Sequence, residues 1–213
     1  HMPLIRYADR LIFFVHIPKT GGTSIEKALQ DAGAKTALLY GSRFEGYSKT
    51  TLQHIDAHIY EKIVPANFYD YSLAIVRHPF TRLVSEYFYR RKRGFAKRTF
   101  DGWLNIAMDE CPKNPYIMDN HFRPQVDFIR PGVEGFRLED GLDIPLAAAA
   151  AQLGLTLGVH ASHVNKSKTK TPVYWTAKTR ARAAAFYRED FDRFGYDPDR
   201  DIAELLIKTP TAP

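Results

Sequence analysis

The feature that most constrains the fold is an apolar run at residues 11–15 followed directly by His-Ile-Pro-Lys-Thr-Gly-Gly-Thr-Ser at residues 16–24. This order predicts a buried strand, a tight turn and the start of a helix. Backbone N–H groups at such a helix start form a natural anion site, to which Lys19 adds a mobile positive charge. The ATP/GTP loop signature does not fit, because its lysine follows the glycines, whereas Lys19 precedes Gly21 and Gly22. We therefore expect a phosphate-like group at this loop, bound in a different way.

A second strand-to-helix junction supplies another candidate phosphate site. An apolar run at residues 71–76 is followed by Arg77, and Pro79 suits the first turn of a helix. Open α/β sheets bind ligands at the C-terminal ends of their strands, where Arg77 is placed. Ser85 follows about two helical turns later, so its hydroxyl can share a face with the helix start. A guanidinium and a hydroxyl converging there would hold a second phosphate, while Arg82 is expected to lie in solvent or to cap the helix.

The two junctions together resemble the sulfotransferases that use 3′-phosphoadenosine 5′-phosphosulfate (PAPS). HIPKTGGTS is similar to their 5′-phosphosulfate loop, and VRHPFTRLVSEY at residues 76–87 is similar to their 3′-phosphate motif. Within that superfamily the chain is most similar to the Golgi-type carbohydrate sulfotransferases and their bacterial relatives, over residues 10–197. Further matching stretches are Leu52–His54, Asp119–Phe128, Val164–Ser167 and Tyr187–Tyr196.

The resemblance implies a donor site for PAPS, with adenosine 3′,5′-bisphosphate (PAP) as the product. Lys19 would stabilise the charge on the bridging oxygen as PAP departs, a contribution of a few kcal/mol. Arg77 and Ser85 would bind the 3′-phosphate and so distinguish PAPS from ATP. Lys166 and Ser167 are secondary candidates for donor ligands, because a loop of this kind folds over the nucleotide in the relatives; a solvated charged loop is the alternative. The residues expected to cradle the 5′-phosphate are Lys19, Thr20, Gly21, Gly22, Thr23 and Ser24.

A hydroxyl acceptor must also lose its proton, and a positioned base accelerates such a step by about 10²–10⁴-fold. His54 occupies the Gln-His position where the Golgi-type relatives carry a base, so it is the first candidate. His58, one helical turn later, would share a face with His54. It is the second candidate, with substrate binding as its alternative role. His121 is the third, with lining of the acceptor pocket as its alternative role. His54 and His58 lack the third ligand of a zinc-protease pattern, so no metal site is expected.

Composition and charge are those of an ordinary globular protein. The chain has 213 residues, of which 45% are hydrophobic, and these values predict a single domain over residues 1–213. No run approaches the ~20 apolar residues of a membrane span. The net charge of +6 suits an anionic donor and an anionic acceptor, although a solvated surface explains it equally well. The basic run at residues 90–93 has no nucleic-acid-binding module beside it, so no nucleic-acid partner is expected.

The single cysteine, Cys111, excludes an intrachain disulfide and fits a reducing compartment. We expect a bacterial cytoplasmic protein, with the Golgi lumen as the alternative if an N-terminal anchor has been removed. His1 and Met2 resemble a remnant of cloning. The sequence makes no prediction about the oligomeric state.

Strand and helix patterns alternate along the chain, which predicts an α/β protein. We expect a P-loop-like three-layer fold with a central, mainly parallel sheet flanked by helices. The Pro- and Asn-rich residues 111–131 are expected to form an irregular lid or insert. Strands are expected at 11–16, 36–40, 71–76, 135–139 and 156–159, and helices at 23–33, 49–64, 80–93, 99–109, 144–153 and 176–194.

These observations predict a PAPS-dependent sulfotransferase that acts on a hydroxyl of a carbohydrate or another small acceptor by in-line displacement. One alternative is a nucleotide or sugar kinase that uses the same loop, which would prefer ATP and require Mg²⁺. The other is a non-catalytic module that binds the nucleotide without turnover.

Overall fold

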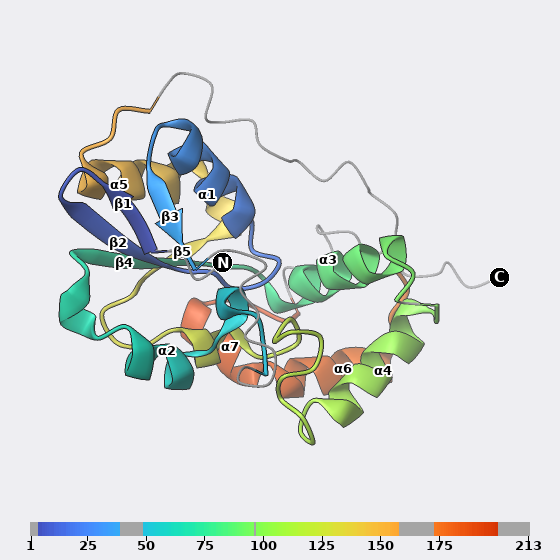
Figure 1. The fold of residues 1–213 in the computed structure, drawn as a ribbon. Coiled ribbons are helices and arrows are strands. Elements are labelled where there is room, and N and C mark those ends of the chain that lie inside the picture. The colour runs from blue at the N-terminus through green and yellow to red at the C-terminus, as the bar shows by residue number, and fades with distance from the viewer. Residues whose placement is uncertain (1–3, 39–48, 96, 158–172, 200–213) are drawn as a thin grey trace.

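The computed structural model describes residues 4–38, 49–95, 97–157 and 173–199 (Figure 1). Over these residues the strands form one mixed sheet of five strands in the order β3-β1-β2-β4-β5. Strands β2, β4 and β5 are parallel, whereas β1 is antiparallel to both β2 and β3. The strands are β1 (Leu4–Tyr7), β2 (Arg10–Val15), β3 (Lys35–Ala37), β4 (Tyr71–Val76) and β5 (Glu134–Arg137).

Helices cover both faces of this sheet, with α1 and α5 on one face and the remaining α-helices toward the other (Figure 1). The expected α/β class, with a mainly parallel centre between helices, is therefore confirmed. The α-helices are α1 (Gly22–Asp31), α2 (Ala57–Ile63), α3 (Pro79–Lys92), α4 (Phe100–Glu110), α5 (Asp143–Leu153), α6 (Ala177–Phe186) and α7 (Arg188–Phe194). Short 3₁₀ helices are η1 (Leu52–His54), η2 (Ala66–Phe68), η3 (Gln125–Phe128) and η4 (Leu138–Asp140).

The alternation of side chains in β2 explains why the sheet needs two covering layers. Ile12 and Phe14 belong to the apolar cluster beneath α1 and α5, whereas Phe13 and Val15 belong to the cluster on the opposite face. Successive side chains of a strand point to opposite faces, so a strand that is apolar at every position must be buried on both. This burial fixes the C-terminal ends of β2 and β4 side by side, where both candidate phosphate motifs begin.

Several helix ends follow the sequence signals. Gly154 closes α5 in the left-handed conformation, with φ 68°, and Gly195 closes α7 in the same way, with φ 66°. Residues 111–131 contain η3 but neither an α-helix nor a strand, as predicted. Predicted elements that the structure bears out, with small shifts of their ends, are the strands at 11–16, 71–76 and 135–139 and the helices at 23–33, 80–93, 99–109 and 144–153.

Only the second half of the helix predicted over 49–64 is an α-helix, namely α2. His54 ends η1, and α2 begins only after Ile55 and Asp56, both of which have extended backbones. Asp56 is the N-cap of α2, a position that aspartate favours over a helix interior. The helical run is therefore broken between His54 and His58.

Two further predictions differ from the structure. The single helix expected over 176–194 is two helices, because Tyr187 leaves helical geometry at φ −104° and ψ 22°. The Tyr187 hydroxyl donates to the Phe122 carbonyl at 2.6 Å, a tertiary contact that helical periodicity does not reveal. The prediction also missed β1, whose four residues pair with β2 in a hairpin. Of the strand expected at 156–159, residues 156 and 157 are not in a strand and the rest lies outside the described residues.

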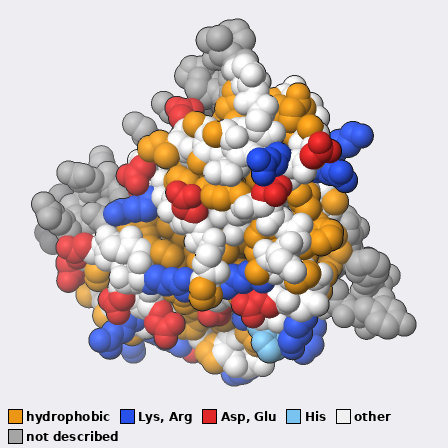
Figure 2. Space-filling model, turned by 90° about the vertical axis from the view of Figure 1, so that its left-hand side faces the viewer, with side chains coloured by type: hydrophobic (Ala, Val, Ile, Leu, Met, Phe, Trp, Pro, Cys, Tyr) orange, Lys and Arg blue, Asp and Glu red, His pale blue; other side chains and the backbone are white. Residues whose placement is uncertain are grey.

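Charged side chains of both signs are interspersed on the face shown in Figure 2, with hydrophobic patches between them. The net positive charge is therefore not gathered into one large patch on this face. Among the residues that the structure describes, no helix combines the length and the apolar character needed to cross a membrane.

Candidate functional site

The loop between β2 and α1 forms the tight turn that the sequence predicts. Gly21 has φ 89°, a left-handed conformation that favours glycine, and α1 begins at the next residue. Thr20 is buried, and its hydroxyl donates to the Ile17 carbonyl at 2.8 Å, which closes the loop. That hydroxyl proton is therefore already used, and Thr20 can offer a ligand its backbone N–H. Ser24 is partly buried and Thr23 is exposed at the start of the helix.

Close packing explains the glycine at position 22. A Cβ atom there would lie 2.9 Å from Cε1 and Nδ1 of His16 and 3.1 Å from Cε1 of Phe14. The buried His16 ring is itself held, because its Nδ1 is 2.5 Å from Oε1 of the buried Glu26. The start of α1 can approach β2 this closely only with glycine at position 22.

Replacing Gly22 by alanine is expected to lower the free energy of unfolding by about 1–3 kcal/mol, because the added methyl group must displace His16 or the helix start. Chemical denaturation measures this effect. Gly135→Ala is the matched control, since a Cβ at Gly135 meets no atom within 4 Å and should change stability by less than about 0.5 kcal/mol. Equal effects of the two substitutions would show that close packing at Gly22 is unimportant.

Lys19 lies where several charged groups converge. It has φ 68°, and its Nζ atom lies 4.1 Å from the centre of the Tyr89 ring. Burial lowers the pKa of Lys19; Glu86 opposes this shift, and the positive charges of Arg77 and Arg93 add to it. An incoming polyanion would relieve this concentration of positive charge, which is what a donor phosphate site requires.

Arg77 is directed at the same loop. Its Nε donates to Oγ1 of Thr81 at 3.0 Å and its Nη1 donates to the Lys19 carbonyl at 3.2 Å. Ser85 is one helical turn beyond Thr81, so the two hydroxyls share a face of α3. The Ser85 hydroxyl makes no hydrogen bond to another described residue. The structure thus brings the two predicted phosphate motifs together through Arg77 and Lys19.

Gln125 holds the backbone of Arg77 in place, a role that the sequence analysis missed. Its side chain accepts from the Arg77 N–H at 2.9 Å and donates to the Arg77 carbonyl at 2.7 Å. Gln125 is fully buried, and its own N–H donates to the Asp190 carboxylate at 2.9 Å. The segment around η3 therefore fixes the end of β4, from which the Arg77 side chain extends.

Arg82 is buried, although it was expected in solvent or at a helix cap. Only 2% of it is exposed. Its guanidinium donates to the carbonyls of Pro18, Arg123 and His121, at 3.0, 2.9 and 2.9 Å. Burial is tolerated because these carbonyls satisfy the planar donors. Arg82 ties the β2–α1 loop to the segment that carries His121.

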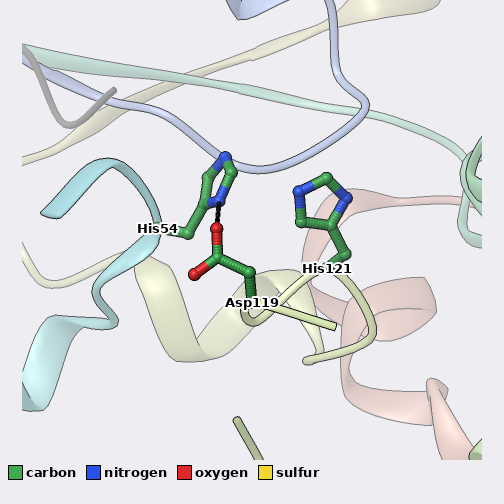
Figure 3. Close-up of side chains that lie close together, drawn as sticks. All are labelled: His54, Asp119 and His121. Atoms are coloured by element: carbon green, nitrogen blue, oxygen red, sulfur yellow. Dashed lines mark hydrogen bonds and ion pairs between the residues drawn. The ribbon is translucent and has the colours of Figure 1, made fainter. Parts of the chain in front are cut away.

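His54 is buried beside Asp119, as Figure 3 shows. Its Nδ1 lies 2.8 Å from Oδ2 of Asp119. Burial lowers the pKa of His54 to about 4, with the Asp119 hydrogen bond acting in the opposite direction. Burial raises the pKa of Asp119, but hydrogen bonds from His54 and Thr51 outweigh this and hold it well below its usual range. At neutral pH, His54 is therefore a neutral imidazole beside an ionised carboxylate.

His121 faces His54 across a short gap (Figure 3). The two rings are perpendicular, with their centres 4.6 Å apart. Nδ1 of His121 is 2.7 Å from Oε2 of Glu86, whose other oxygen accepts from Nε of Arg90 at 2.6 Å. His121 also stacks on Tyr89, the ring that Lys19 contacts. Contacts therefore run from Lys19 through Tyr89 and His121 to His54.

His16, at the start of the β2–α1 loop, also contacts His54. The centres of the His16 and His54 rings are 5.6 Å apart, with an angle of 67° between the ring planes. Three of the predicted site residues, Lys19, His54 and His121, thus lie in one cluster, with Arg77 adjacent to it.

Two groups of predicted residues do not join this cluster. His58 is exposed on α2, where its Nε2 lies 3.1 Å from Nζ of Lys62. It was expected to share a helical face with His54, and this was wrong because the extended Ile55 and Asp56 separate the two helical turns. Lys166 and Ser167 lie outside the described residues.

His54, Asp119 and His121 each offer a ligand atom within 4.8 Å of the others, a grouping of the kind that can hold a metal ion. Both oxygens of Asp119 already accept short hydrogen bonds, from Thr51 and from His54. We interpret the cluster as a hydrogen-bonded histidine–carboxylate arrangement.

Comparison with known proteins gives the family. The model of the Sulfotransferase family matches residues 4–197, which include every element described above. The chain belongs to the sulfotransferase family. It is accordingly a sulfotransferase enzyme, and members of this family generally use PAPS as the sulfuryl donor. No curated protein and no solved structure matches the chain.

Proposed function

We propose that this sulfotransferase transfers the sulfuryl group of PAPS to an acceptor hydroxyl on a carbohydrate, by in-line displacement with His54 as the general base. The observation that carries the proposal is the convergence of Lys19, Arg77 and His54 from three separate segments on one site. This reaction needs a cation near the leaving group, a group that binds phosphate and a base for the acceptor proton. The ammonium group of Lys19, the planar guanidinium of Arg77 and the neutral imidazole of His54 match these three needs.

The donor would bind along the edge of the sheet where β2 and β4 end. Backbone N–H groups of residues 20–23 and the positive end of α1 would hold the 5′-phosphosulfate. Arg77, already aimed at the loop, would hold the 3′-phosphate together with the Ser85 hydroxyl. The partly buried, crowded charges around Lys19 support the binding of a highly anionic nucleotide.

In the transfer step, the bond from sulfur to the bridging oxygen of PAPS breaks and a bond from sulfur to the acceptor oxygen forms. Negative charge develops on the bridging oxygen, where Lys19 would stabilise it. The acceptor proton would pass to the neutral imidazole of His54. His121, perpendicular to His54 and stacked on Tyr89, would line the acceptor side of the site.

The acceptor is proposed to be a carbohydrate hydroxyl, with an anionic acceptor favoured by the end of α3. Arg93 stacks on Tyr89, with its Cζ atom 4.3 Å from the ring centre. Exposed basic side chains continue from there, namely Arg91, Lys92, Lys97 and Arg98. We also propose a bacterial cytoplasmic location, with which the free, buried thiol of Cys111 is compatible.

The test is calorimetric titration with PAP, 5′-AMP, ADP and ATP with Mg²⁺. PAP is expected to bind most tightly, and Arg77→Ala should weaken PAP binding by about 10–100-fold, because a charge-assisted hydrogen bond contributes about 1.5–3 kcal/mol. Arg188→Ala, which removes an equal charge from a well-exposed position on α7, should leave PAP affinity unchanged.

The outcomes separate the alternatives. Tighter binding of ATP with Mg²⁺ than of PAP would favour the kinase. Binding of PAP without any turnover of PAPS, across a panel of sugar hydroxyls, would favour the non-catalytic module.

A further inference from the structure

We infer that Asp119 is a positioning residue for sulfuryl transfer: it takes the Nδ1 proton of His54 and so leaves Nε2 of His54 as the atom that receives the acceptor proton. This inference rests on the proposed role of His54. A neutral imidazole carries one proton and one lone pair, and an ionised carboxylate can only accept a hydrogen bond. The 2.8 Å contact therefore places the His54 proton on Nδ1. In Figure 3 the second ring nitrogen of His54 points away from Asp119.

Asp119 is itself fixed by the turn that carries His54. The Thr51 N–H donates to Oδ1 of Asp119 at 2.6 Å, and the Thr51 hydroxyl donates to Oδ2 at 2.8 Å. Thr51 is the N-cap of η1, which ends at His54. One short turn thus fixes the Asp119 carboxylate relative to the His54 imidazole.

The backbone around Asp119 is strained in a way that supports this role. Met118, Asp119 and Asn120 have φ 54°, 61° and 61°, three consecutive left-handed residues without a glycine. Such conformations persist where surrounding contacts enforce them, and they cluster at functional sites. Here Asn120 donates to the His54 carbonyl at 2.7 Å, and the Met118 carbonyl accepts from Arg90 at 2.7 Å. The strained turn brings Asp119 onto His54.

Asp119→Asn tests the inference because the geometry dictates how the amide must lie. The Thr51 N–H needs an acceptor at the Oδ1 position, so the amide oxygen stays there. The amide NH₂ then occupies the Oδ2 position, where one N–H donates to the Thr51 hydroxyl, which turns from donor to acceptor. The other N–H donates to Nδ1 of His54, which forces the ring proton onto Nε2. In this state Nε2 can no longer accept a proton from the acceptor.

The first readout is the protonation of the His54 ring, measured by ¹⁵N NMR. Wild-type protein is expected to carry the proton on Nδ1, and the Asp119→Asn variant is expected to carry it on Nε2. The second readout is the conversion of PAPS to PAP, with water or a sugar hydroxyl as acceptor. It should fall by about 10²-fold or more, as expected for loss of a general base, while PAP affinity stays within about twofold. Asp127→Asn, on the same segment but half-exposed, is the matched control and should change neither readout.

A double substitution separates this inference from the proposed function. If Asp119 acts through His54, Asp119→Asn should cause no further loss of rate in a His54→Gln background. Additive losses, or an unchanged ring proton in Asp119→Asn, would overturn the role of Asp119 while leaving His54 as the base. Full activity of His54→Gln would instead overturn the proposed function. Should Asp119→Asn fail to fold, the wild-type spectrum still decides, since an Nε2 proton there contradicts the inference.

Discussion

Replacing Lys19 by methionine is expected to lower the rate of PAPS turnover by about 10²–10³-fold, the usual cost of removing one group that stabilises developing charge. Methionine keeps much of the length of the side chain and its contact with Tyr89 but removes the charge. The folded protein should tolerate this change, because burial already lowers the pKa of Lys19 and so disfavours its charged form. The measurement is the single-turnover rate of PAP formation, with thermal unfolding as a check on the fold.

Lys27→Met is the matched control for this substitution. Lys27 lies on α1 close to the loop, but it is exposed and pairs with Asp31 one turn later. Such a pair contributes only about 0.3–0.5 kcal/mol, so turnover should be unchanged. Equal turnover rates of the Lys19→Met and Lys27→Met variants would show that Lys19 does not stabilise the leaving group.

His54→Gln is expected to lower turnover by about 10²–10⁴-fold, the contribution of a positioned base. The pH profile gives a sharper test. The neutral ring is the active form, so wild-type activity should be lost as the pH falls through the pKa of His54, which burial lowers to about 4. Above that value the rate should be level through neutral pH, and the variant should lack the acidic limb. The profile of kcat/KM for PAPS measures both effects.

His58→Gln is the control, because His58 is exposed on α2 and bonds to Lys62. This substitution should leave the rate and the pH profile unchanged. Loss of activity in His58→Gln, with His54→Gln active, would reverse the assignment of the base.

Local order in the sequence was enough to predict the two strand-to-helix junctions where we propose that the donor binds. The loop at residues 16–24 and the junction at Arg77 are contiguous segments, each following an apolar strand, and strand ends in a parallel sheet meet at one edge. Glycine at positions 21 and 22 is likewise a local requirement, set by a positive φ at Gly21 and by the His16 ring at Gly22. These features depend on short-range geometry, which a sequence pattern records.

The acceptor side could be predicted only in part. His54 and His121 were singled out by resemblance, yet the sequence indicates no role for Asp119 or Glu86, the carboxylates that hold them. Asp119 lies 65 residues from His54 along the chain, and nothing in either segment indicates that they pair. His58 was ranked second because helical spacing was assumed across the break at Ile55 and Asp56.

By itself, then, the sequence determined most of the alternation of strands and helices, the two strand-to-helix junctions where we propose that the donor binds, and the family. Only the tertiary structure decided which carboxylate holds each histidine, that Arg82 is buried against three carbonyls, and that Gln125 fixes Arg77. The physical reason is that strands, turns and caps follow from neighbouring residues. The partner of a buried polar group depends instead on which distant segments pack beside it, because burial without a hydrogen-bonding partner is costly.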